Sequence, residues 1–352
     1  FIGLTTGSTG IPSGGVITHA NALRHTASHE AWRYPQEDVP RPPAHVLIVL
    51  PLRLAWTIGS VLVHFAVGGP VVLLPEAAKI DDLLRAAIAW GDAILTVAPN
   101  ACRYFLRAAP GTGLLLPKLR RLETGGQPLY GDERRAILAR VTPNFHESYG
   151  STAAGFVAGS AGPDVIAHPD SVGRAQPGIE ISIVDPAGRP VPVGTDGEIR
   201  SRPLKAQERC PESGGAGGGE RIVDGWCYTG DIGHLDAEGY LYLKGRGTDL
   251  IRRNGVEIFA AEIEAALGAH PGVAEVAVIG VTVGGNDQVA AFMVKRGALD
   301  HDDVARHCRE RLKPDQFPDR VFYAEELPRI PGGKVNRIRL QEIAADAIKQ
   351  GR

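Results

Sequence analysis

The sequence predicts an α/β protein in which a large αβ N-terminal domain carries a β-rich lobe and is joined by a hinge to a small α+β C-terminal domain. Two changes of pattern along the chain predict this arrangement. Up to about residue 160, apolar strand-like blocks alternate with segments of helical spacing, and from residue 179 the strands become short and are separated by Gly and Asp-Pro turns. After Arg246 a compact series of helices and strands begins.

The large domain is expected to contain a βαβ sheet covered by helices. Its strand-like blocks are rich in Val, Ile and Leu throughout, as strands buried on both faces are. The intervening segments place apolar side chains at helical spacing. We expect strands at residues 45–52, 70–74, 93–97 and 144–149, the last ending in a turn at Gly150, and helices at 79–90 and 132–141.

Shorter segments with strand or helix periodicity predict the β-rich lobe and the small domain. In the lobe, strands are predicted at residues 180–185, 197–202 and 240–244, and Thr229, Gly230 and Asp231 are interpreted as a tight turn. In the small domain we expect helices at 260–267 and 302–312 and strands at 273–281, 288–294 and 320–324. The predicted boundaries are 1–245 for the large domain (sheet 1–175, lobe 176–245), 246–249 for the hinge and 250–352 for the small domain.

Composition narrows the classes of partner. A chain of 352 residues that is 43% hydrophobic is long enough for about two domains with cores of their own. The 38 basic and 40 acidic residues leave a formal charge of −2, which predicts no nucleic-acid partner and no anionic membrane. The four cysteines form no CxxC pair, which argues against a zinc site or disulfide framework and suits a reducing cytoplasm. No apolar run approaches the ~20 residues of a membrane helix.

Residues 3–12, GLTTGSTGIP, have the composition of a phosphate-binding loop. Backbone N–H groups approach phosphate oxygens most closely where side chains are small or absent. The loop lacks the GxxxxGK[ST] spacing of P-loop proteins, which argues against a kinase or GTPase of that class. By itself, a stretch this short is more often an ordinary Gly/Ser/Thr turn.

Four motifs in order resemble those of the adenylate-forming superfamily, which includes acyl-CoA synthetases, peptide-synthetase adenylation domains and luciferases. They are the glycine loop at 3–12, YGST at 149–152, the hinge region at 226–262 and PRIPGGKVNR at 328–337. They span nearly all of the chain. The sequence is similar to a free-standing acyl-CoA ligase, and this resemblance implies that a leading portion of the large domain precedes Phe1.

The resemblance implies an ATP site between the two domains. The expected phosphate-binding residues are Thr5, Thr6, Gly7, Ser8, Thr9 and Gly10, and the expected adenine-binding residues are Gly125, Gly126, Gln127, Glu147, Ser148, Tyr149 and Gly150. Asp231 and Arg246 are expected to bind the ribose, since an ionised carboxylate can accept two hydrogen bonds. Two catalytic residues are implied: Thr152, at the α-phosphate, and Lys334, whose ammonium would neutralise charge on the α-phosphate and departing pyrophosphate.

Two positions depart from the superfamily pattern. Ser13 replaces a lysine that follows the loop proline, and Ala153 replaces a glutamate that helps to hold Mg²⁺. We therefore assign no metal-ligating residue, although Mg²⁺ is expected to accompany ATP. Magnesium keeps several waters and binds largely through substrate phosphates, so the loss of one carboxylate weakens its binding without excluding it.

The predicted reaction is ATP-dependent activation of a small carboxylic acid to an acyl-adenylate, followed by transfer to a thiol, for which CoA is preferred. Rotation about the hinge residues Thr248 and Asp249 would separate the two steps, and Gly255 would then line the CoA channel. One alternative acceptor is the phosphopantetheine thiol of a carrier protein. A different class of function is a degenerate homologue that binds nucleotide or partners with weak or no adenylation activity, because Ser13 and Ala153 remove groups from one subsite.

Overall fold

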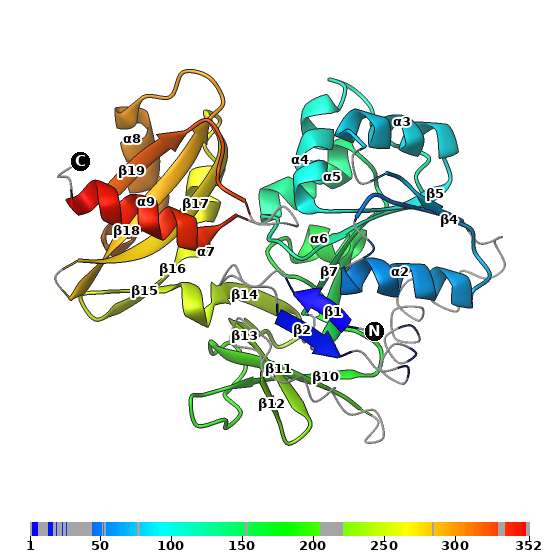
Figure 1. The fold of residues 1–352 in the computed structure, drawn as a ribbon, viewed down its shortest axis with the longest axis horizontal. Helices are drawn as coiled ribbons and strands as arrows, with labels where there is room; N and C mark the ends of the chain where they lie inside the picture. The colour runs from blue at the N-terminus through cyan, green and yellow to red at the C-terminus, as the bar shows by residue number, and fades with distance from the viewer. Residues whose placement is uncertain are drawn as a thin grey trace.

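The computed structural model describes residues 2–5, 13–16, 19, 23, 26, 44–50, 52, 54–75, 78–151, 154–204, 221–283, 285–329 and 335–349. Within these ranges the chain forms a helix-covered sheet, on the right in Figure 1, a small domain on the left and a β-rich lobe below them. The predicted fold class, a large αβ domain with a smaller α+β domain, is confirmed.

The large domain is built on a sheet of seven described strands in the order β4-β3-β5-β6-β7-β8-β9. The first five are parallel, and β8 and β9 continue the sheet antiparallel. The strands are β3 (His45–Ile48), β4 (Val71–Leu73), β5 (Ala93–Val97), β6 (Arg121–Gly125), β7 (Phe145–Ser151), β8 (Gly155–Ala161) and β9 (Arg174–Ala175). The described helices are α2 (Ala55–Ala66), α3 (Ile80–Trp90), α4 (Pro99–Ala108), α5 (Gly131–Arg140) and α6 (Gly162–Ala167).

The core of this domain lies between the sheet and the helices α3, α4 and α5. Leu95 and Leu122 from the strands pack with Phe105 and Ile137 from the helices, and all four are fully buried. Because the first five strands are parallel, their carboxyl ends lie at one edge of the sheet, where ligand sites of open α/β sheets are found. This edge of the sheet faces the β-rich lobe and the small domain.

The first described residues form a separate two-stranded antiparallel hairpin. β1 (Ile2–Thr5) and β2 (Ser13–Val16) are antiparallel, and Thr5 pairs with Ser13. The predicted phosphate loop therefore joins two antiparallel strands, although residues 6–12 themselves lie outside the described ranges.

The β-rich lobe is an antiparallel sheet in which β10, β11, β13 and β12 follow one another and β14 also pairs with β13. Its strands are β10 (Ile179–Val184), β11 (Gly197–Pro203), β12 (Arg221–Val223), β13 (Trp226–Leu235) and β14 (Leu241–Arg246). The predicted tight turn at Thr229, Gly230 and Asp231 is wrong, because these residues lie inside the continuous strand β13. Gly230 has a φ of +76° and a register shift follows at Ile232 and Gly233, so glycine here allows an irregularity within a strand.

The small domain has a three-stranded sheet with helices on both faces. Its elements are η2 (Gly247–Asp249), β15 (Leu250–Arg253), β16 (Val256–Phe259), α7 (Ala260–Gly268), β17 (Val273–Val283), β18 (Asn286–Lys295), α8 (His301–Arg311), η3 (Pro314–Gln316), β19 (Arg320–Ala324) and α9 (Arg337–Lys349). Side chains alternate along β17: Val278 packs with Ile263 of α7, whereas Ile279 packs with Leu340 of α9.

The two domains contact each other beside the hinge. Lys244 of β14 donates a hydrogen bond to Glu262 of α7 at 3.2 Å. Tyr130, which precedes α5, lies against Gly268 at the end of α7, where an added Cβ would be 3.8 Å from its ring. The structure therefore shows the domains packed together, with the carboxyl ends of the large sheet facing the small domain.

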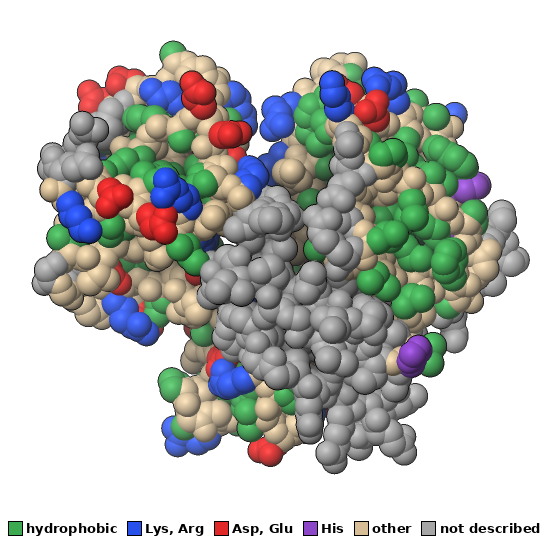
Figure 2. All heavy atoms as spheres, viewed as in Figure 1, with side chains coloured by type: hydrophobic (Ala, Val, Ile, Leu, Met, Phe, Trp, Pro, Cys, Tyr) green, Lys and Arg blue, Asp and Glu red, His purple; other side chains and the backbone are tan. Residues whose placement is uncertain are grey.

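Further features of the described residues are their surface charge, the length and polarity of their helices, and their cysteines. Figure 2 shows acidic and basic side chains interspersed over the small domain. Of the described helices, none is long and apolar enough to cross a membrane. The described cysteines, Cys102, Cys227 and Cys308, are buried and form no disulfide with one another, and burial raises the pKa of the Cys102 thiol to about 12.

Candidate functional site

A cleft of about 1860 Å³ lies where the large sheet, the β-rich lobe and the small domain meet. Residues at the carboxyl ends of parallel strands line it, including Ala98 after β5 and Gly126 after β6. The small domain contributes residues of α7 and the start of α9. Of the sites predicted from the sequence, the cleft is lined by Gly125, Gly126, Gln127, Glu147, Ser148, Tyr149, Gly150, Asp231, Arg246 and Asp249.

Tyr149, Asp231 and Arg246 form one connected cluster in this cleft. The Tyr149 hydroxyl donates to Asp231 Oδ2 at 2.7 Å and lies 3.1 Å from Thr229 Oγ1. Arg246 Nε is 3.3 Å from Asp231 Oδ1, because the two residues are partners in the β13–β14 register. Burial, together with the Asp231 carboxylate, raises the pKa of Tyr149 well above its ordinary value, so its hydroxyl keeps its proton and remains a donor.

Two of the predicted adenine-binding glycines are required by close backbone approach. A Cβ at Gly125 would lie 2.4 Å from the carbonyl oxygen of Ser148, and one at Gly150 would lie 2.1 Å from that of Gly155. Any larger residue would push neighbouring strands apart. The prediction that Gly150 ends the strand in a turn is wrong, since β7 continues to Ser151.

Glu147 is part of a buried ion pair. Its carboxylate contacts the guanidinium of Arg134 from α5, and the two side chains are 3% and 4% exposed. Arg134 also donates to the carbonyl of Pro169 at 2.9 Å. Burial raises the pKa of Glu147, and the Arg134 charge opposes that rise. The side chain of Glu147 thus has a structural partner, and its predicted contact with adenine stays a prediction.

The described residues on either side of the Lys334 segment, Arg329 and Val335, lie at the cleft. Arg329 and Val335 pair as an antiparallel bridge and both line the cleft, and the N–H of Asn336 donates to the Pro328 carbonyl at 2.7 Å. Lys334 itself lies outside the described residues, as do Thr152, Ala153 and, in the phosphate loop, Thr6, Gly7, Ser8, Thr9 and Gly10. Thr5 is described only as part of strand β1.

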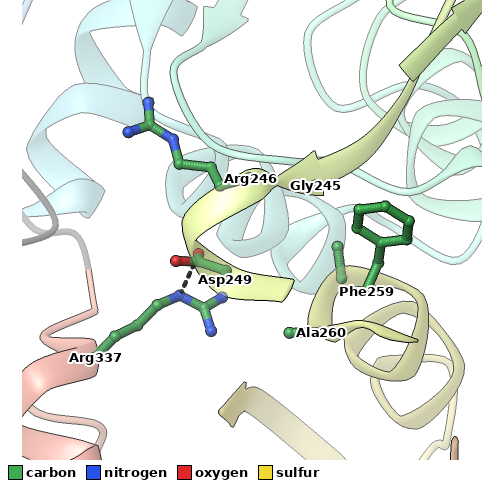
Figure 3. Close-up of a pocket in the computed structure, with 7 residues that line it drawn as sticks. Gly245, Arg246, Asp249, Phe259, Ala260 and Arg337 are labelled. Atoms are coloured by element: carbon green, nitrogen blue, oxygen red, sulfur yellow. Dashed lines mark ion pairs between the residues drawn. The ribbon is translucent and has the colours of Figure 1, made fainter. Parts of the chain in front are cut away.

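A small pocket beside the hinge brings together residues that the sequence did not predict as a group (Figure 3). Arg337, at the start of α9, places Nε 3.3 Å from Asp249 Oδ2 and donates from Nη2 to Glu264 Oε1 at 2.6 Å. Burial opposes the charge on Arg337, but the Glu264 and Asp249 carboxylates outweigh it and raise the pKa of the guanidinium. Arg246 points away from this pair (Figure 3).

The other two predicted residues do not line the cleft. Gly255 lies in the turn between β15 and β16 with a φ of +80° and is exposed. The Thr248 hydroxyl donates to Asp249 Oδ1 at 3.2 Å, within η2. Both sites stay predictions in this arrangement of the domains.

Two family models match the chain. The model of the AMP-binding enzyme family matches residues 1–203, and that of the AMP-binding enzyme C-terminal domain matches residues 262–334. Together they cover the phosphate loop, the strand that carries Tyr149 and the Lys334 motif as far as Lys334 itself.

Individual relatives and solved structures agree with the family models. The chain is 31% identical to a sulfoacetate–CoA ligase of Cupriavidus necator over 96% of its own length and 65% of that protein. It is 30% identical to the fatty acid–[acyl-carrier-protein] ligase ScoC of Streptomyces coeruleorubidus, with 96% and 66% covered. The crystal structure of ATP-bound MatB from Rhodopseudomonas palustris superposes with a TM-score of 0.81 at 27% identity, covering 98% of this chain and 68% of MatB.

The chain thus spans about two thirds of the length of these relatives. Its fold and the order of its two matched regions correspond to one family. The chain belongs to the AMP-binding enzyme family, within the adenylate-forming superfamily.

Proposed function

We propose that this protein is an AMP-forming acid–thiol ligase, which activates a small carboxylic acid with ATP and transfers the acyl group to a thiol, most simply that of CoA. The observation that carries the proposal is the Tyr149–Asp231–Arg246 cluster, in which residues from β7, β13 and β14 meet in one cleft. The names of the relatives support it, because one is a CoA ligase and another an acyl-carrier-protein ligase.

In this proposal the cluster binds the nucleoside of ATP. The Tyr149 ring stacks on adenine beside the Gly125–Gly126 backbone, and Asp231 accepts hydrogen bonds from the ribose hydroxyls. Tyr149 and Arg246 already hold the Asp231 carboxylate in one orientation. The Asp231 side chain therefore loses little conformational entropy when ATP binds. Thr152 and the loop from Thr5 to Gly10 would bind the phosphates.

The chemistry takes place in two steps. A carboxylate oxygen of the acid attacks the α-phosphorus, the bond to the bridging oxygen breaks, and pyrophosphate leaves. Lys334 neutralises the charge that builds on these oxygens. The thiolate then attacks the carbonyl carbon of the acyl-adenylate, a thioester forms and AMP leaves.

Magnesium enters the proposal only as a partner of ATP. The position of the superfamily's glutamate holds Ala153, and the described residues contain no group of three His, Cys, Asp or Glu side chains that could hold a metal ion. The chain therefore does not supply the expected carboxylate. Mg²⁺ would be bound by phosphates and water, and no step is assigned to it.

The two steps need different positions of the small domain. We propose residues 1–245 and 250–352 as the moving bodies, Thr248 and Asp249 as the hinge, and Gly255 as part of the CoA channel after rotation. A carrier protein is the second candidate acceptor, because of the similarity to ScoC. We place the enzyme in the cytoplasm, in keeping with its described cysteines, which are buried and form no disulfide with one another.

ATP–pyrophosphate exchange with a panel of carboxylic acids tests the proposal on the full-length protein. Exchange that depends on at least one acid supports carboxylate activation, and mass spectrometry of the acyl-AMP identifies the acid. CoA and a phosphopantetheinylated carrier protein are then compared as acceptors. If ATP binds but no acid supports exchange, the degenerate homologue is the correct interpretation.

The substitution Tyr149→Phe is expected to raise the KM for ATP about tenfold while kcat changes little. Phenylalanine keeps the stacking ring but removes the hydrogen bond that orients the Asp231 carboxylate, and a hydrogen bond to a charged group contributes about 1.5 kcal/mol. Exchange rates measured over a range of ATP concentrations give both constants.

Tyr240→Phe is a matched control for this substitution. It removes another hydroxyl that donates to a carboxylate, that of Asp164 at 2.7 Å, from a residue that does not line the cleft. A Tyr240→Phe enzyme with the same rise in KM, or a Tyr149→Phe enzyme with unchanged KM and reduced kcat, would contradict the assigned role of Tyr149.

A further inference from the structure

Arg337 connects two carboxylates that come from different parts of the chain. Glu264 belongs to α7 and is 7% exposed, whereas Asp249 ends the short helix η2 and is 24% exposed. The guanidinium also donates to the Val278 carbonyl, and Glu264 accepts from the Val278 N–H at 2.8 Å. Arg337 is thus fixed at three points, two of which belong to the core of the small domain.

The third point lies in the proposed hinge. Glu264 and Val278 are parts of α7 and β17, so they move with Arg337 when the small domain rotates. Asp249 is three residues after Arg246, which contacts Asp231 in the cleft. A rotation about the hinge therefore changes the distance from Arg337 to Asp249 but leaves the pair with Glu264 intact.

Arg337 is also tied to the lysine loop. It follows Lys334 by three residues, and only Val335 and Asn336 separate the two. Val335 pairs with Arg329 at the base of the loop, and that base lines the cleft. Arg337 therefore begins α9 directly after the described residues Val335 and Asn336, which connect it to Lys334 in the sequence.

We propose that Arg337 is a positioning residue for Lys334, and that its ion pair with Asp249 holds the lysine loop in the arrangement used for adenylation and is released when the small domain rotates for thiol transfer. This inference rests on the proposed function of the site. The cleft and the lysine loop would then be linked by one continuous path, from Asp231 through Arg246, along the chain to Asp249, and across the ion pair to Arg337.

The exposure of the Arg337–Asp249 ion pair determines how strongly its loss should affect adenylation. Both partners are about one quarter exposed, so solvent weakens the interaction. A second bond between the domains, from Lys244 to Glu262 at 3.2 Å, supports the same arrangement. Loss of the Asp249 charge should therefore reduce the population of the adenylation arrangement about fivefold rather than abolish it.

Asp249→Asn tests the inference without leaving a charge buried and unpaired, because Glu264 still compensates Arg337. The adenylation rate, measured by exchange with the acid identified above, should fall about fivefold. Thioester formation from supplied acyl-AMP and CoA should be unchanged or faster. Asp249→Glu keeps the carboxylate and should retain most of the adenylation rate.

Glu342→Gln provides the matched control. It makes the same carboxylate-to-amide change opposite another arginine of α9, Arg339, in an exposed pair that lines neither the cleft nor the pocket beside the hinge. It should alter neither half-reaction. The inference is overturned if Asp249→Asn leaves adenylation unchanged, if it slows both half-reactions equally, or if Glu342→Gln produces the same imbalance.

A distance measurement separates this inference from the proposed function. Nitroxide labels at Asp132→Cys and Asp346→Cys, in a Cys210→Ser background, place one exposed probe on each domain. With ATP present, electron–electron double resonance should give one main distance for the labelled parent and an additional population after Asp249→Asn. Absence of exchange with every acid would refute the proposed function only, whereas identical distance distributions would refute the role of the Arg337–Asp249 pair.

Discussion

Lys334→Ala is expected to slow the adenylation half-reaction by about a hundredfold or more, while thioester formation from supplied acyl-AMP changes little. In the first step, negative charge builds on the α-phosphate and the leaving pyrophosphate, and the lysine ammonium stabilises it in a cleft closed by both domains. In the second step the pyrophosphate has gone and the small domain has rotated. Exchange measurements and a thioester assay on the same protein preparation give the two rates.

Lys349→Ala, at the exposed end of α9, is the control for this substitution. It removes a lysine from the small domain without affecting the loop whose base is formed by Arg329 and Val335. Equal losses in both half-reactions of Lys334→Ala would show that the lysine has a general structural role. A normal adenylation rate would show that another cation stabilises the charge.

The regular elements were predictable where a single local pattern dominated. The strand at residues 93–97 has the bounds predicted for it, since five buried apolar or β-branched residues allow little else. The helix α2 was not predicted, because the sequence AWTIGSVLVHFA is apolar on several faces and lacks a clear helical period. In β13, Gly230 suggested a turn, but β11 pairs with β13 on both sides of Gly230, at Tyr228 and at Ile232, and the irregularity between these pairs is a register shift within the strand.

Side-chain partners were less predictable than motifs. The resemblance indicated Tyr149 and Asp231 separately, and only the packing of β7 against β13 shows that they bond to each other. Arg337 stands in the Lys334 motif, but its partner Glu264 is 73 residues earlier in the chain. Arg134 and Glu147 each follow a local helix or strand pattern, and no local signal pairs them. Such contacts depend on how elements are placed in three dimensions.

Arg134→Met is expected to lower the free energy of unfolding by about 3–5 kcal/mol at neutral pH. The substitution keeps most of the apolar volume of the side chain but leaves the Glu147 carboxylate buried at 3% exposure without its cation. It also removes the donor to the Pro169 carbonyl. Urea unfolding followed by tryptophan fluorescence measures the loss, and nucleotide binding should weaken in parallel because Glu147 lies two residues before Tyr149 on β7.

The loss of stability should depend on pH in a defined direction. Burial already raises the pKa of Glu147, and removal of the Arg134 charge that opposes this rise should raise the pKa further. A carboxyl group whose pKa is higher in the folded than in the unfolded protein binds protons preferentially when folded, so it becomes less destabilising as the pH falls. The difference between Arg134→Met and the parent protein should therefore be smaller at pH 5 than at pH 8.

Two further variants test whether the buried Glu147 charge causes the loss of stability in Arg134→Met. Arg134→Met combined with Glu147→Leu removes both charges and should recover much of the lost stability, because an apolar pair of similar size avoids the desolvation penalty. Arg135→Met breaks the exposed pair with Asp132 on the same helix and should change stability by less than about 1 kcal/mol at either pH. If Arg134→Met shows the same deficit at both pH values, the loss comes from packing rather than from an unpaired carboxylate at Glu147.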